Sequence, residues 1–178
     1  CETIKLLYNF PSVVYYTIFN EGWGEHKPDY YYQLVKGLDN TRVIDATSGW
    51  FFGKKSDVSS LHVYFKKIKL NKSDLPIIVS EFGGYAYKVK GHVYAENKFF
   101  GYKRFNNQVD YDNAIYNLYK NDIINNIKNG LAGCIYTQIS DVYDEVNGLI
   151  TFDRKVLKVN KDTMIKIKNE IDKEFYNE

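Results

Sequence analysis

The sequence has little cysteine, little net charge and no long apolar run. Two cysteines among 178 residues make neither a disulfide framework nor a metal-ligand spacing. A formal net charge of +2 gives no sign of a nucleic-acid or membrane partner. We find no run of membrane-spanning length, no signal-peptide pattern, no phosphate loop, no dinucleotide fingerprint and no Ser/His/Asp set. Nucleotide-dependent and serine-hydrolase chemistry are therefore not expected.

Aromatic residues are abundant instead, with 17 tyrosines, 11 phenylalanines and two tryptophans. At this density aromatics suit a stacking cleft, although most of them must pack in the core or on half-buried surface. The length is sufficient for one domain with a sizeable core. Cys134 lies in an apolar run and is expected to be an inert core thiol. The first residue is Cys1, which suggests that the chain is cut from something longer. Localisation therefore stays open, with a cytoplasmic one favoured.

Extended and helical patterns alternate along the chain. Runs rich in β-branched and aromatic residues predict five strands, at 13–19, 42–46, 61–64, 77–80 and 131–137. Helical spacing predicts helices at 2–9, 28–38, 111–128 and 161–175, and residues 83–107 are predicted to form a long loop. This order predicts an α/β fold with βα units and a parallel sheet.

Two of the predicted strands end in a glutamate that is followed by glycine. Strand 13–19, expected to be buried on both faces, leads into Asn20-Glu21-Gly22-Trp23-Gly24, and strand 77–80 leads into Glu81-Phe82-Gly83-Gly84. Parallel α/β folds place their chemistry at the carboxyl ends of strands. A carboxyl pair there suits glycoside hydrolysis, which needs one protonated group to donate to the leaving oxygen and one ionised group to attack. The alternative is two surface carboxylates.

Taken together, the motifs Phe19–Gly24 and Ser80–Gly84 resemble glycoside hydrolase family 2, the β-galactosidase and β-glucuronidase family. The catalytic domain of that family is a (β/α)8 TIM barrel. Further matches follow in the family's order, at Pro11–Val14, Asp45–Trp50, His62–Tyr64, Gly133–Gln138 and Asp144–Leu149. The resemblance implies that residues 1–178 are about the C-terminal half of such a barrel, strands four to eight with their helices.

The resemblance also implies roles for single residues. Glu21 would be the general acid/base and Glu81 the nucleophile of a retaining β-glycosidase. Asn20 would hold the 2-hydroxyl of the sugar, and Tyr64 would hydrogen-bond the nucleophile. His62 is expected in the pocket only, since a lone histidine is more often structural than catalytic.

Other candidate residues keep two interpretations. Trp23 and Trp50 stack on a sugar or belong to the core, at even odds. Gln138 stands where many relatives carry tryptophan, so an amide would hydrogen-bond where an indole would stack. Lys54-Lys55 and Lys66-Lys67 are expected to be solvated faces, and Asp144-Glu145 surface or loop-capping groups.

The implied partner is a carbohydrate substrate, and the chemistry requires no cofactor, although some relatives use a divalent ion. Two alternatives stay open. One is another retaining barrel family of the same clan, cellulase- or mannanase-like, and the other is a non-catalytic carbohydrate-binding module. A barrel that lacks strands one to three would expose the edges of strands 13–19 and 131–137. We therefore expect the isolated chain to self-associate and to show little or no activity.

Overall fold

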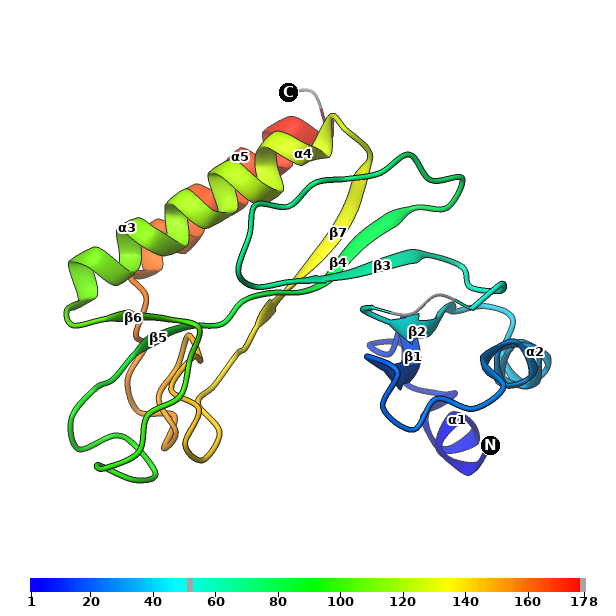
Figure 1. Cartoon of the computed structure of the whole chain (residues 1–178), viewed down its shortest axis with the longest axis horizontal. Helices are drawn as coiled ribbons and strands as arrows, with labels where there is room; N and C mark the ends of the chain where they lie inside the picture. Colours follow the sequence, from blue (N-terminus) through cyan, green and yellow to red (C-terminus); the bar gives the residue numbers. More distant parts are fainter. Residues whose placement is uncertain (51–52, 177–178) are drawn as a thin grey trace. The chain divides into compact units, whose positions relative to one another are not determined.

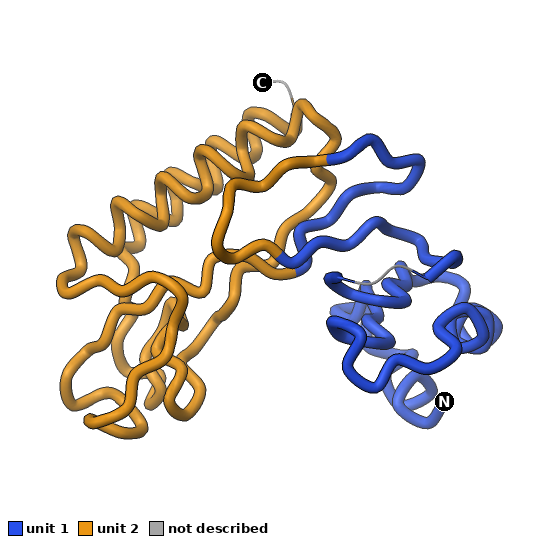
Figure 2. Tube along the Cα trace, viewed as in Figure 1, with its two compact units in different colours: residues 1–62, 71–80 blue, residues 63–70, 81–178 orange. Residues whose placement is uncertain are grey.

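The computed structural model describes residues 1–50 and 53–176, which form a mixed α/β structure (Figure 1). The chain divides into two compact units (Figure 2). Unit 1 comprises residues 1–62 and 71–80, and unit 2 comprises residues 63–70 and 81–178. Among the described residues, no helix combines the length and apolar character needed to cross a membrane.

Unit 1 is built on a strand–helix–strand motif. It contains α1 (Glu2–Leu7), β1 (Tyr15–Asn20), α2 (Pro28–Leu38), β2 (Val43–Ser48) and most of β3 (Ser59–Val63). Strands β1 and β2 pair in parallel, with Tyr15 opposite Val43 and Asn20 opposite Ser48. Pro28 starts α2, where its fixed φ suits a helix and its missing N–H is not needed. The predicted βα unit with parallel strands is confirmed here.

The core of unit 1 is formed by Tyr16, Val35 and Ile44, from β1, α2 and β2. Strand β1 is therefore covered on the face that carries Tyr16, whereas the next residue, Thr17, is exposed. The prediction that this strand is buried on both faces is wrong. Successive side chains of a strand point to opposite faces, and the unit 1 core covers only one of them.

A polar cluster around Asp39 ties β1 to the segment between α2 and β2. Its carboxylate accepts hydrogen bonds from the Thr41 hydroxyl at 2.6 Å, the Arg42 guanidinium at 2.5 Å and the Tyr16 hydroxyl at 3.1 Å. The Arg42 Nε also donates to the Val13 carbonyl at 2.5 Å. The Thr41 hydroxyl most of all, with the arginine and tyrosine after it, holds the pKa of Asp39 well below its usual range.

Strand β4 passes from unit 1 into unit 2 and is well buried. It runs over Ile77–Gly83, and Val79 and Phe82 are fully buried. The remaining elements are β5 (Tyr85–Tyr87), β6 (Lys103–Phe105), α3 (Gln108–Leu118), a π-helical segment (Tyr119–Ile124), α4 (Asn125–Ile127), β7 (Leu131–Thr137) and α5 (Lys161–Tyr176). The prediction of a strand at 131–137 is confirmed, and the long helix predicted at 111–128 is found with a π-helical stretch inside it.

The core of unit 2 is aromatic. The Phe82 ring meets Tyr119 and Tyr136 edge-on, with centroids 5.2 and 5.6 Å away. Helices α3 and α5 lie side by side (Figure 1). Glu170 of α5 accepts from the Tyr116 hydroxyl at 2.8 Å and pairs with Lys120 at 2.7 Å.

The described strands form three small sheets, in the orders β1-β2, β3-β4-β7 and β5-β6, and no closed barrel. The first and the last are parallel pairs. The prediction of one long loop at 83–107 is wrong in detail because this segment contains β5 and β6. The alternation in Tyr85-Ala86-Tyr87 buries Ala86 completely, which gives that short pair an inner face.

Candidate active site

Glu21 follows β1 in an unusual backbone conformation. Its φ is 54°, in the left-handed region, and Gly22 follows at 77°. The Glu21 N–H still donates to the Ser48 carbonyl at 2.7 Å, as though the pairing of β1 with β2 continued. A residue other than glycine in this region costs about 1–3 kcal/mol, and such residues gather at functional sites. The turn predicted from the glycines is present, and the strained backbone conformation is that of Glu21.

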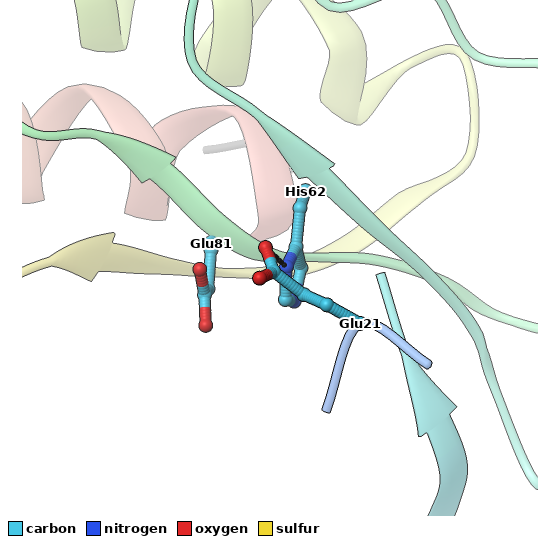
Figure 3. A group of neighbouring side chains, drawn as sticks. All are labelled: Glu21, His62 and Glu81. Atoms are coloured by element: carbon cyan, nitrogen blue, oxygen red, sulfur yellow. Dashed lines mark hydrogen bonds and ion pairs between the residues drawn. The ribbon is translucent and has the colours of Figure 1, made fainter. Parts of the chain in front are cut away.

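The Glu21 carboxylate is paired with His62 of β3 inside unit 1. The Oε1 atom lies 2.7 Å from Nδ1, and the two side chains point toward one another (Figure 3). His62 is only 8% exposed. Gly49 makes this approach possible, because a Cβ there would lie 2.7 Å from the same Nδ1. A small residue after β2 therefore creates the space in which the imidazole reaches Glu21.

The other nitrogen of His62 opens onto a buried chain of serines. Nε2 lies 2.9 Å from the Ser48 Oγ, which is itself 2.9 Å from Ser80 and 3.3 Å from Ser60. Ser60 and Ser80 are 2.5 Å apart. All three serines are buried. The sequence analysis missed them. The available signal was a hydroxyl in each of three neighbouring strands, at the end of β2, inside β3 and just before Glu81.

This chain of groups can hold Glu21 in either charge state. When the carboxylate is ionised, the Nδ1–H donates to it and Nε2 accepts from Ser48. When Glu21 is protonated, its hydroxyl donates to Nδ1, the Nε2–H donates to Ser48, and Ser48 donates on to Ser80. Each arrangement leaves every polar hydrogen with an acceptor, which a buried network requires.

The order of atoms in Ser48, His62 and Glu21 is that of a serine-hydrolase triad. No motif in the sequence indicates it, because Ser48 is 14 positions from His62, His62 is 41 positions from Glu21, and the acid is a glutamate. Ser48 is only 4% exposed and shares its hydroxyl with Ser80. A nucleophile must reach an acyl carbon, so we interpret Ser48 as a support for His62.

Glu81 lies in β4 within unit 2 (Figure 3). A tyrosine holds its carboxylate. The Tyr64 hydroxyl donates to the Glu81 Oε2, and the Tyr64 oxygen lies 3.0 Å from the Thr137 hydroxyl. Since the only phenolic hydrogen goes to Glu81, Thr137 must be the donor in the second bond. Burial first, and the Glu81 carboxylate second, raise the pKa of Tyr64. The phenol therefore stays protonated and remains a donor. The pairing of Tyr64 with Glu81 agrees with the role that the resemblance gave it.

Residues Asn20, Trp23 and Trp50 all lie on the surface of unit 1. Asn20 is exposed at the end of β1, opposite Ser48. Trp23 is 77% exposed and Trp50 is 56% exposed. The core alternative for the tryptophans is therefore wrong, and stacking on a sugar stays a prediction.

Gln138 is held inside unit 2 by two neighbours. Its amide nitrogen donates to the Asn147 Oδ1 at 2.8 Å and to the Glu145 Oε2 at 3.0 Å. Asn147 is fully buried and also donates to Glu145, at 3.2 Å. Both side-chain amide hydrogens of Gln138 are thus used within unit 2. Of its side-chain atoms, only the Oε1 oxygen could then bind the sugar that was expected here from the sequence. Glu145 anchors this triplet instead of lying loose on the surface.

A buried ion pair holds the loop that follows β7. Lys158 Nζ lies 2.7 Å from the Asp141 Oδ1 and 2.9 Å from the Val146 carbonyl, and both charged side chains are inaccessible. Burial lowers the pKa of Lys158, and the carboxylate opposes that shift. Breaking such a pair leaves an uncompensated buried charge and costs about 3–5 kcal/mol.

Cys134 of β7 is a free, partly buried cysteine. Burial raises the pKa of its thiol to about 11, which agrees with the predicted inert thiol. Searched against models of protein families, the chain matches none, and no curated protein matches it either.

Proposed function

We propose that this chain carries the acid/base and the nucleophile of a retaining β-glycosidase and corresponds to strands four to eight of a (β/α)8 barrel of glycoside hydrolase family 2. The observation that carries the proposal is the contrast between the partners of two strand-end glutamates. Glu81 is held by a phenol that donates its one hydrogen to the carboxylate and accepts from Thr137, and Glu21 by an imidazole whose two nitrogens can exchange donor and acceptor roles. Glycoside hydrolysis needs this division between an ionised carboxylate and one that changes its charge.

In the first step Glu81 attacks the anomeric carbon and forms a glycosyl ester, while the glycosidic C–O bond breaks. Glu21 gives its proton to the departing oxygen. The Tyr64 hydroxyl donates to the Glu81 carboxylate and orients it before the attack. After this transfer, His62 donates to the ionised Glu21 once its ring hydrogen has moved from Nε2 to Nδ1.

In the second step water attacks the same carbon. Glu21 takes the proton of this water, the bond to Glu81 breaks, and the sugar leaves with its original anomeric configuration. Glu21 thus changes charge twice in each cycle, and the serine chain behind His62 supplies a partner for each arrangement. For this mechanism we expect a carboxyl separation of roughly 5–5.5 Å, against roughly 6.5–9.5 Å in inverting enzymes.

The proposal is tested by incubating residues 1–178, and any longer natural chain that contains them, with a panel of nitrophenyl β-glycosides. Nitrophenol release gives the rate, and proton NMR of the first sugar formed gives its configuration. The proposal requires a β-product. An α-product would contradict it. Sugar binding without release would favour the non-catalytic alternative, which the exposed Trp23 and Trp50 would serve.

A further inference from the structure

Unit 2 contains a hollow beside Tyr64 that the proposed chemistry does not use. One part is a cavity of about 360 Å³ between the segment that follows β3, strands β5 and β6, and the π-helical turn. A second part, of about 510 Å³, adjoins it along α3. The two parts adjoin, because both are lined by Lys67, Tyr85, Lys103, Leu118 and Asp122, and together we call them the hollow. Its size lies in the range of roughly 300–1,000 Å³ that small-molecule sites occupy.

Three lysines line this hollow: Lys66, Lys67 and Lys103. Among the described residues, no carboxylate lies within ion-pair distance of any of the three. The Lys103 ammonium lies 5.4 Å from the centroids of both Tyr85 and Phe105, which flank it on β5 and β6. All three lysines are exposed, as was expected of Lys66-Lys67, and all three line the same hollow.

The acidic groups of the hollow neutralise it only in part. Asp122 accepts a hydrogen bond from the Ile68 N–H at 3.3 Å. Burial raises the pKa of Asp122, and Lys67 is close enough for its ammonium to oppose that shift. Asp110 is engaged with Asn107 at the start of α3. Three ammonium groups therefore face two carboxylates, and the hollow keeps an excess of positive charge. Tyr64, Tyr85 and Tyr102 supply aromatic surface in the first part of the hollow.

We propose that this hollow binds an anionic group, a sulfate ester or a carboxylate, carried by an acidic saccharide. The lysines would pair with the anion, and the tyrosine rings would contact the apolar faces of the sugar. Tyr64 belongs both to the lining and to the Glu81 pair, so the bound saccharide would lie next to the nucleophile. The choice of a saccharide rests on the proposed function, whereas the anion site rests on the lysines alone.

The test is a titration of residues 1–178 with galactose 6-sulfate, glucuronate, inorganic sulfate and neutral galactose, followed by calorimetry and by NMR of the chain. We expect one or both anionic sugars to bind roughly tenfold or more tightly than galactose, and the binding to weaken with added salt. Lys103→Met should weaken the binding by roughly tenfold or more, and Lys103→Arg should retain it. Lys155→Met, at an exposed lysine elsewhere in unit 2, is the control and should change nothing.

Each other outcome overturns a stated part of the proposal. Equal binding of galactose and the anionic sugars, or an equal loss in the Lys155 variant, would overturn the anion site. If inorganic sulfate bound as tightly as galactose 6-sulfate, the part of the proposal that assigns the site to a saccharide would be wrong. If Lys103→Met lowers the melting temperature, Lys67→Met provides the second measurement. Because binding needs no turnover, a failure of the proposed hydrolysis would be seen separately, as absent nitrophenol release with intact binding.

Discussion

Glu21 and Glu81 occupy similar places in the sequence and dissimilar surroundings in their units. Glu21 directly follows β1 and precedes Gly22, and Glu81 lies near the end of β4, two positions before Gly83. Glu21 sits in a left-handed backbone and faces His62, which is backed by buried serines. Glu81 continues a regular, buried strand and faces Tyr64, which is backed by Thr137.

The difference shows how two identical side chains receive different chemistry. The Tyr64 phenol, whose pKa is raised by burial, keeps its one hydrogen and gives it to Glu81 while it accepts from Thr137, so it favours the ionised form of its partner. An imidazole can exchange donor and acceptor roles between its two nitrogens, so it tolerates a partner that gains and loses a proton. The supports, more than the glutamates themselves, distinguish a nucleophile from an acid/base.

The largest expected effect comes from removing each carboxylate in turn. Glu81→Ala should abolish turnover of all β-glycosides, and azide should rescue it with inverted product. Glu21→Ala should slow substrates with poor leaving groups by about 10²–10⁴-fold and spare activated ones in the first step, because those need no proton. Rates on a leaving-group series measure both effects.

The matched control for these variants is Glu2→Ala, an exposed glutamate of α1, which should leave every rate unchanged. Circular dichroism would show that the variants remain folded. The reverse pattern, with azide rescue at Glu21 and leaving-group dependence at Glu81, would exchange the two roles.

The next effect tests the support of Glu81. Tyr64→Phe keeps the ring but removes the donor, and a hydrogen bond to a charged group contributes about 1.5–3 kcal/mol. If that stabilisation acts on the reacting carboxylate, kcat/KM should fall by roughly 10–150-fold. Tyr176→Phe, at an exposed tyrosine, is the control. An unchanged kcat/KM in Tyr64→Phe would show that the phenol is only packing.

Local patterns in the sequence predicted much of the fold. The strands at 131–137 and 77–80 and the helices at 28–38 and 161–175 are present because periodicity and start signals such as Pro28 act within a few residues. The division into small sheets, the exposed face of β1 and the pair β5-β6 were not predicted. They depend on which segments pair across long stretches of chain, and local propensity does not encode that choice.

The candidate site, like the fold, was predicted in part. Sequence motifs predicted the two glutamates, Tyr64 and the glycine turns. Ser48, Ser60, Ser80 and Thr137 were not, because a serine or threonine in a strand has many uses and only its partners show which one applies. The tryptophans could not be assigned to core or surface without knowing what covers them.

Acid should destabilise the unit that carries Glu21 through Asp39. The pKa of this carboxyl is lower in the folded state, so its contribution to stability is complete above the unfolded pKa of about 4 and is lost as the pH falls toward the folded value. Asp39→Asn should lower stability at pH 7 and flatten the dependence of the urea midpoint on pH below about 4. Asp74→Asn, at an exposed aspartate of the same unit, should do neither. Hydrogen exchange resolved by residue would show the loss in unit 1, and identical slopes in wild type and Asp39→Asn would contradict the assignment.

The smallest effect separates the two supports most sharply. Thr137→Val removes a neutral hydrogen-bond donor to Tyr64, and such a bond contributes about 0.5–1.5 kcal/mol. The kcat/KM should therefore fall about tenfold at most, and equally at every pH.

Ser48→Ala removes the partner of the His62 Nε2. The arrangement with protonated Glu21 needs an acceptor for the Nε2–H, whereas the ionised arrangement does not, so the variant disfavours the general acid. In Ser48→Ala alone, kcat/KM should therefore fall more for substrates with poor leaving groups than for activated ones, because only the poor leaving groups need the proton of Glu21. If Ser48→Ala showed no dependence on the leaving group, the serines behind His62 would have a structural role only, and the contrast between the two glutamates would lose its chemical meaning.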